Sequence, residues 1–272
     1  MFREIVENVK RTSPLIHNIT NYVTVNDCAN ILLACGGSAI MADDIDEVEE
    51  ITSICYLIQD NNNDHIAIFY PGAMDGKLAE KLEDGLFRKT KLGVVTVAAR
   101  QDNEEFFKQC KKYNVPVVFG MKDDFNAFPE AFLKELLTGS KIIFTNEVER
   151  GIIEKLYGFR DITELFDIGE ADIIVTTLGK DGSICYERTG QGVQREKVGI
   201  CPVEHVVDAT GSGDSYMSGF LYGYLNGKEA KECCVMGSVL SWFVLQKEGC
   251  CTSLPTEGEF LKKYEDWISG RS

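Results

Sequence analysis

The sequence lacks the features that would connect it to nucleic acid or to a membrane. It has no run of basic residues, and its 28 lysines and arginines are outnumbered by 43 acidic residues, which gives a net charge of −15. Nucleic acids and anionic membranes bind clustered positive charge, so we expect neither as a partner. No apolar run approaches the roughly 20 residues of a membrane span. The first residues carry charges without an apolar core, so we expect no signal peptide.

Several common catalytic motifs are also missing. There is no Gly-x-x-x-x-Gly-Lys-Ser/Thr, which excludes a P-loop enzyme, and no complete Gly-x-Gly-x-x-Gly follows a strand, which argues against a dinucleotide oxidoreductase. With only three histidines, no serine–histidine–acid arrangement can be assembled. The ten cysteines come without a secretory signal or zinc spacing, which indicates free, mostly core-packed thiols in a reducing, cytoplasmic compartment.

The hydrophobic pattern predicts an α/β fold. Strand-like and helix-like runs alternate after about residue 90, which is typical of a mostly parallel central sheet with helices on both faces. No repeat, linker or low-complexity tract interrupts the chain, so we expect a single domain over residues 1–272. Predicted strands are 38–41, 56–59, 65–70, 92–98, 116–119, 141–145, 173–177 and 183–186. Predicted helices are 2–11, 25–35, 46–54, 103–113, 129–138, 148–157, 162–166 and 215–225, with two more toward the C-terminus.

The most informative stretch covers residues 206–220. Gly211 and Gly213 follow β-branched residues and precede a helix-like run, so backbone N–H groups at the helix start can hold an anion. Asp214 adds a carboxylate beside this anion hole. That combination suits phosphoryl transfer, in which the carboxylate accepts the proton of an attacking hydroxyl. A plain turn with Asp as the helix N-cap is the alternative for the tetrapeptide alone.

Two further segments extend the candidate site. Asn146 and Glu149 form an Asn-x-x-Glu pattern where a strand ends and a helix begins, which also suits an ordinary capping box. Residues 175–182 place Gly179 and Gly182 on a turn after a strand. Ligands of α/β proteins bind at the carboxyl ends of the strands, which is where both segments are expected.

Residues 208–214 resemble the Asp-x-x-Gly-Ala-Gly-Asp signature of the ribokinase (PfkB) family of sugar and nucleoside kinases, with Ser212 in place of the usual Ala. The resemblance extends from about Cys55 to the end of the chain. It implies a ribokinase-like fold, ATP and Mg²⁺ as cofactors, and a monovalent cation such as K⁺ near residues 246–250. It assigns the general base to Asp214, the anion hole to Gly211, Ser212 and Gly213, and acceptor binding to Asp208. It also implies that Asn146 and Glu149 organise Mg²⁺ and the ATP phosphates. Thr177, Gly179 and Gly182 are expected to lie beside the bound nucleotide.

The N-terminal part, residues 1–54, differs from that family. Residues 14–30 and 41–44 look very like hydroxyethylthiazole kinase of thiamin salvage, a cousin in the same superfamily. That resemblance would place Asn21, Val23 and Met41 against a thiazole. The Gly-Gly-x-x-x-Asn motif with which ribokinases hold sugar hydroxyls is not reproduced after Gly36.

A polar-tipped hairpin at 56–70 corresponds to half of a ribokinase lid, whose other half is missing from the sequence. A lone hairpin is marginally stable and leaves an open edge. It is therefore expected either to meet a neighbouring subunit, in a dimer or trimer, or to mark a mosaic chain.

The expected activity is transfer of the γ-phosphoryl group of ATP to an alcohol of a small molecule, a sugar or nucleoside. Phosphorylation of hydroxyethylthiazole and nucleotide binding without efficient catalysis are the alternatives.

Overall fold

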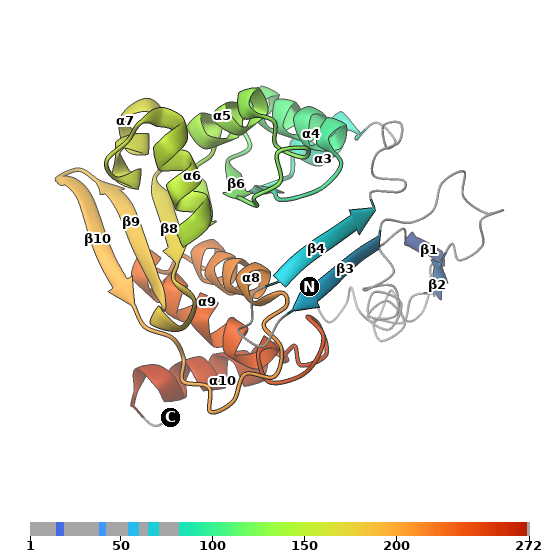
Figure 1. Ribbon diagram of the computed structural model, residues 1–272, viewed down its shortest axis with the longest axis vertical. Coiled ribbons are helices and arrows are strands. Elements are labelled where there is room, and N and C mark those ends of the chain that lie inside the picture. The colour runs from blue at the N-terminus through green and yellow to red at the C-terminus, as the bar shows by residue number, and fades with distance from the viewer. Residues whose placement is uncertain (1–14, 19–37, 42–53, 60–64, 71–81, 271–272) are drawn as a thin grey trace. The chain divides into compact units, whose positions relative to one another are not determined.

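The computed structural model describes residues 15–18, 38–41, 54–59, 65–70 and 82–270 (Figure 1). The chain divides into two compact units, Met1–Glu80 and Lys81–Ser272. The expected single-domain organisation over residues 1–272 stays a prediction.

The described part of the first unit consists of two strand pairs. β1 (Leu15–Asn18) runs parallel to β2 (Ser38–Met41), and β3 (Ile54–Gln59) runs antiparallel to β4 (His65–Tyr70). The strand at 38–41 and the hairpin are confirmed, whereas β1 was not among the predicted strands. The predicted helix at 46–54 is wrong at its last residue, because Ile54 begins β3. Its remainder and the helices predicted at 2–11 and 25–35 lie outside the described residues.

The second unit contains a six-stranded sheet in the order β10-β9-β8-β7-β6-β5. β5 to β8 are parallel, and β9 and β10 run antiparallel at one edge. The predicted mostly parallel sheet is confirmed. The polar strand β10 was missed because most of its residues are exposed at an edge and show no apolar alternation. The strands are β5 (Gly93–Val95), β6 (Val117–Gly120), β7 (Ile142–Asn146), β8 (Ile173–Thr177), β9 (Ser183–Thr189) and β10 (Gly192–Val198).

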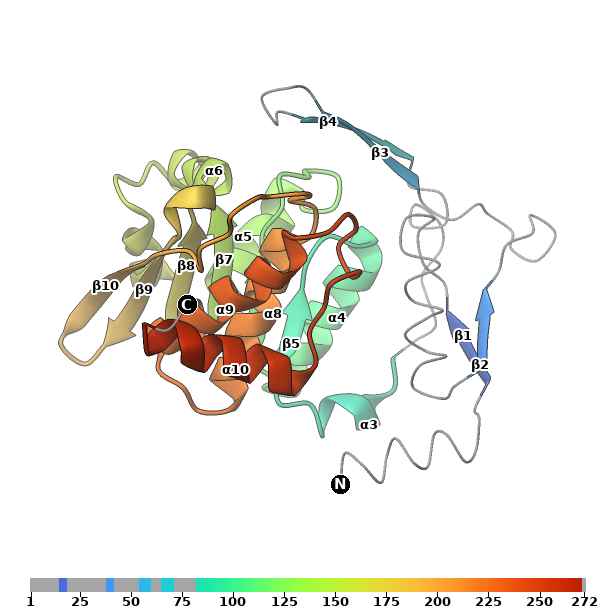
Figure 2. The same ribbon diagram turned by 90° about the horizontal axis from the view of Figure 1, so that it is seen from below.

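Helices cover both faces of this sheet, as predicted. The helices are α3 (Asp84–Phe87), α4 (Arg100–Lys112), α5 (Glu130–Gly139), α6 (Glu147–Tyr157), α7 (Leu165–Ile168), α8 (Ser212–Leu225), α9 (Ala230–Val244) and α10 (Glu257–Ile268). α3 to α7 pack on one face and α8 and α9 on the other. α10 packs against α9, and Figure 2 shows α8, α9 and α10 grouped on one side of the sheet. The short helix α3 was not predicted.

The strand residues alternate between two hydrophobic cores. Phe119 and Ile143 are fully buried against α4, α5 and α6, whereas Val118 and Ile142 are buried against α8 and α9. This alternation follows from the two-residue period of a strand. Since both faces are covered, the first three residues of β6, β7 and β8 are all apolar, which is typical of a parallel sheet.

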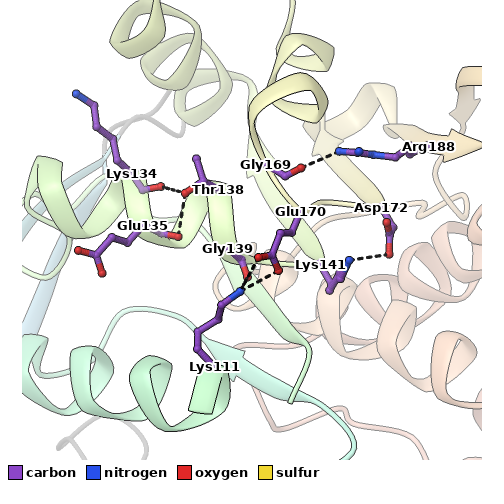
Figure 3. Close-up of polar contacts among 10 residues, drawn as sticks. All are labelled: Lys111, Lys134, Glu135, Thr138, Gly139, Lys141, Gly169, Glu170, Asp172 and Arg188. Atoms are coloured by element: carbon purple, nitrogen blue, oxygen red, sulfur yellow. Dashed lines mark hydrogen bonds and ion pairs between the residues drawn. The ribbon is translucent and has the colours of Figure 1, made fainter. Parts of the chain in front are cut away.

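Polar contacts close the amino-terminal end of the sheet (Figure 3). The Lys111 ammonium binds both Glu170 carboxylate oxygens at 2.8 and 2.9 Å and donates to the Gly139 carbonyl at 3.4 Å. Lys141, just before β7, lies 3.6 Å from the Asp172 carboxylate just before β8. These contacts lie at the opposite end of the sheet from the carboxyl ends of the strands, where ligands of α/β proteins bind.

Candidate active site

A cavity of about 410 Å³ lies where β6, β7 and β8 end and α8 begins. Five residues proposed from the sequence line it together: Asn146, Glu149, Thr177, Gly213 and Asp214. The cavity is completed by residues that the sequence did not single out: Gly120, Met121, Lys122, Phe144, Thr145 and Met217.

Gly211 makes the turn that starts α8. Its φ of +77° is in the left-handed region, and a Cβ at this position would lie 2.5 Å from Cys250 Cβ. Its carbonyl accepts the first helical hydrogen bond, from Ser215 N–H at 2.8 Å. Only glycine fits this turn, because a side chain would meet both the φ restriction and the segment that contains Cys250.

The first N–H groups of α8 define the anion-binding end. Ser212 N–H donates to the Ala209 carbonyl at 3.1 Å. Within the described part of the chain, the N–H groups of Gly211, Gly213 and Asp214 have no acceptor, and of these only Gly213 and Asp214 line the cavity. The expected part of Gly211 and Ser212 in the anion hole stays a prediction, and the donors that line the cavity are those of Gly213 and Asp214. They add to the positive end of the helix dipole.

Asp208 holds the loop before α8 in place. One carboxylate oxygen accepts Thr210 N–H at 2.8 Å, and the other accepts Gly249 N–H at 3.0 Å. These bonds, led by the one from Gly249, hold the pKa of Asp208 below its usual range. Asp208 is not among the cavity-lining residues, so its expected contact with the acceptor stays a prediction.

Asn146 and Glu149 form a capping box and also line the cavity. Asn146 Oδ1 accepts Glu149 N–H at 2.8 Å, and Glu149 Oε2 accepts Asn146 N–H at 2.7 Å. Glu149 is only 5% exposed. Burial raises its pKa, although the Asn146 N–H and the charge of Lys122 act in the opposite direction. The structural and functional interpretations of this motif are therefore compatible.

In the segment where β8 ends and the following turn begins, Thr177 lines the cavity, whereas Gly182 packs against β10. The Thr177 hydroxyl donates to the Thr145 carbonyl at 3.3 Å, and Thr177 lines the cavity. Gly182 has φ +89°, and a Cβ there would lie 2.0 Å from the Val198 carbonyl oxygen. Packing against β10 therefore explains this glycine. Gly179, with φ +54° and open space around it, and Gly182 are not among the cavity-lining residues.

Lys122 is the charged residue among the six described lining residues that the sequence reasoning missed. Its Nζ lies 3.2 Å from Asp214 Oδ1, and it is the only lysine or arginine among the lining residues. The available signal was its position directly after the predicted strand at 116–119, where α/β proteins place ligand contacts.

The donor chemistry of the cavity fits Mg²⁺ bound together with a nucleotide. Among the described residues, no group of three or more His, Cys, Asp or Glu side chains could hold a metal ion. Mg²⁺ commonly keeps several waters and binds through one or two carboxylates and substrate phosphates. Glu149 would supply such a carboxylate, and a bound nucleotide would supply the phosphates.

The expected contacts to an acceptor in the N-terminal part are largely outside the described residues. Asn21 and Val23 lie there, whereas Met41 ends β2 opposite Asn18 in the parallel pair.

Among the described residues, no helix combines the length and apolar character needed to cross a membrane.

Known protein families match two parts of the chain. The family model described as pfkB family carbohydrate kinase matches residues 40–257, and the hydroxyethylthiazole kinase family matches residues 6–58. A nucleoside kinase of Methanothermobacter thermautotrophicus is 30% identical over 79% of this chain and 67% of its own length. The hydroxyethylthiazole kinase of Clostridium acetobutylicum is 82% identical over 55 residues, which are 20% of either chain.

Solved structures show the same fold. The Burkholderia thailandensis nucleoside kinase in complex with inosine has a TM-score of 0.72 at 19% identity, covering 94% of this chain and 81% of that one. The Methanocaldococcus jannaschii nucleoside kinase has a TM-score of 0.70 at 22% identity, covering 96% and 84%.

The architecture is thus that of the ribokinase-like kinases, as the sequence predicted. The chain belongs to the pfkB family of carbohydrate kinases. Its N-terminal fifth is similar to hydroxyethylthiazole kinases, so both resemblances are confirmed. The chain spans a fifth of the hydroxyethylthiazole kinases that it matches and about two thirds of the archaeal nucleoside kinases.

Proposed function

We propose that the protein transfers the γ-phosphoryl group of Mg-ATP to a hydroxyl group of a nucleoside. One observation carries this proposal: a carboxylate, Asp214, lies beside the N–H groups that begin α8, in the same cavity as Asn146 and Glu149. A site built only to hold an anion would not place a carboxylate at the anion's position, because like charges repel. A carboxylate is needed where a hydroxyl must lose its proton.

The residues divide the work of such a transfer. Asp214 accepts the proton of the attacking hydroxyl, and the N–H groups of Gly213 and Asp214 bind the charge on the moving phosphoryl group. Asn146 and Glu149 would hold Mg²⁺ together with the ATP phosphates, whose negative charge the ion would help to neutralise. Their mutual capping bonds keep both side chains in one geometry before the nucleotide arrives.

Two observations bear on the acceptor. Two relatives that align with about four-fifths of the chain are nucleoside kinases, which favours a nucleoside over other sugars. The N-terminal fifth, which includes Met41, is instead 82% identical to a hydroxyethylthiazole kinase. Hydroxyethylthiazole is therefore the second candidate acceptor. A protein that binds ATP without phosphorylating either acceptor is the third.

The test is acceptor-dependent ADP release from Mg-ATP, with and without K⁺. Adenosine, inosine, cytidine, ribose, fructose 6-phosphate and hydroxyethylthiazole serve as acceptors, and Asp214→Asn is the matched variant. We expect turnover with a nucleoside and a loss of about 10²–10⁴-fold in kcat for Asp214→Asn, since this variant lacks the general base.

Other results would change the conclusion in defined ways. Turnover of hydroxyethylthiazole alone would make the second candidate correct. Near-full activity of Asp214→Asn would remove the assignment of the base. ATP binding without turnover of any acceptor would leave a nucleotide-binding protein.

A further inference from the structure

A single ammonium group lies among the carboxylates of the candidate active site. Met121 N–H donates to the Phe144 carbonyl at 3.0 Å, so the pairing of β6 with β7 continues one residue past β6. Lys122 follows directly and leaves the sheet at its carboxyl edge. Its Nζ then lies 3.2 Å from Asp214 Oδ1.

The charges around Lys122 are mostly negative. Asp214 and Glu149 line the same cavity, and the charges of Lys122, Asp123 and Asp214 all act on Glu149. Lys122 acts on Glu149 in the favourable direction, whereas the two aspartates act in the unfavourable one. A nucleotide triphosphate would bring more negative charge into this cavity. Among the described residues that line the cavity, Lys122 is the only lysine or arginine that could meet it.

The Lys122 ammonium can readily exchange the Asp214 carboxylate for another anionic partner. The side chains of Lys122 and Asp214 are 38% and 59% exposed, respectively, and ion pairs so open to solvent contribute little to stability. The lysine stem is flexible, and its ammonium can rotate any of three N–H groups toward a new acceptor. A phosphoryl oxygen offers a short, charge-assisted hydrogen bond in place of the carboxylate.

We propose that Lys122 is a catalytic residue that leaves Asp214 when ATP binds and donates to a non-bridging oxygen of the γ-phosphoryl group. This inference rests on the proposed function of the same cavity. The departure of Lys122 leaves Asp214 Oδ1 open to the acceptor hydroxyl. In the transfer the bond from the phosphorus to the ADP oxygen breaks and the bond to the acceptor oxygen forms. Asp214 takes the hydroxyl proton, while Lys122 remains protonated throughout.

A positioning role for Lys122 makes a different prediction. A lysine that only oriented Asp214 would affect turnover but would not distinguish nucleotides by their γ-phosphate. A lysine that binds the γ-phosphoryl group must favour ATP over ADP. The two roles therefore separate in a binding measurement that needs no acceptor and no turnover.

The experiment is titration calorimetry with the full-length protein, using the magnesium complexes of ADP and of the β,γ-imido analogue of ATP. For Lys122→Met we expect the affinity for the analogue to fall about tenfold, the effect of losing one charged hydrogen bond, with ADP affinity within about twofold of wild type. Lys122→Arg should retain most of the preference, because it keeps a positive donor. Lys108→Met removes the same charge from an exposed position on α4 and should change neither affinity.

The outcomes separate this inference from the proposed function. Equal weakening of both nucleotides by Lys122→Met, or no change in either, would overturn it. A fall in turnover with an unchanged nucleotide preference would also overturn it, and would leave Lys122 as a positioning residue for Asp214. If wild type turned over no acceptor, the proposed function would fail, yet the nucleotide preference would still decide the role of Lys122.

Discussion

Glu149 shows how one residue can serve a function at a cost in stability. It is a nearly fully buried carboxylate whose pKa is raised by that burial. A raised folded-state pKa means that the folded protein binds the proton more tightly than the unfolded chain does. The contribution of Glu149 to stability is then fully present below its unfolded-state pKa, near 4.5, and is lost as the pH rises through the folded-state pKa. At neutral pH its charge therefore opposes folding.

Glu149→Gln is expected to separate the two roles. Glutamine is neutral at every pH and can still accept the Asn146 N–H bond of the capping box. The Tm of the variant minus that of wild type should therefore be larger at pH 8 than at pH 4, while kcat falls because the Mg²⁺-organising charge is gone. Calorimetric scans at the two pH values check the first part. A Tm difference independent of pH would show that ionised Glu149 does not oppose folding.

At the scale of elements, the start of α8 combines two glycines with different functions. Gly211 is required by its backbone angle and by its contact with Cys250. Gly213 lies inside the helix, and a Cβ there would meet nothing within 4 Å. Its small size therefore serves the cavity that it lines rather than the fold.

The matched pair Gly211→Ala and Gly213→Ala tests this division. Gly211→Ala should destabilise the protein by at least about 1–2 kcal/mol, the cost of a left-handed non-glycine residue. Gly213→Ala should leave stability unchanged or raise it by about 0.5–1 kcal/mol, the helix preference for alanine. It should nevertheless lower kcat, since a methyl group would hinder the approach of a phosphoryl group to the N–H donors. Urea unfolding and steady-state kinetics of both variants measure these effects, and full activity of Gly213→Ala would contradict the assigned role.

At the scale of the whole molecule, the β3–β4 hairpin favours association of several copies of the chain. In the described part of the chain these two strands pair only with each other, and an isolated two-stranded hairpin is marginally stable and leaves open edges. We therefore expect a dimer or trimer in which the hairpin meets a neighbouring subunit. Light scattering at micromolar concentration should give a mass of two or three chains, and a monomer would contradict this expectation.

Much of the second unit could be predicted from the sequence because its signals are local. The apolar runs that became β6, β7 and β8 are recognisable from residue types alone, as is the capping pattern of Asn146 and Glu149. The edge strand β10 and the start of β1 carry no comparable pattern. Their pairing depends on partners distant in the chain, so local periodicity could not reveal it.

The sequence by itself determined the family and the α/β class, because both follow from residue type and spacing. For the same reason it singled out Asp214, Asn146 and Glu149 as candidate site residues. Only the tertiary structure decided that the helix-start donors lining the cavity are those of Gly213 and Asp214, and that Gly182 packs against Val198. It also brought Lys122 to Asp214 from a position 92 residues earlier in the chain. The reason is physical: side chains from separate strands meet only when the sheet brings their carboxyl ends to one edge.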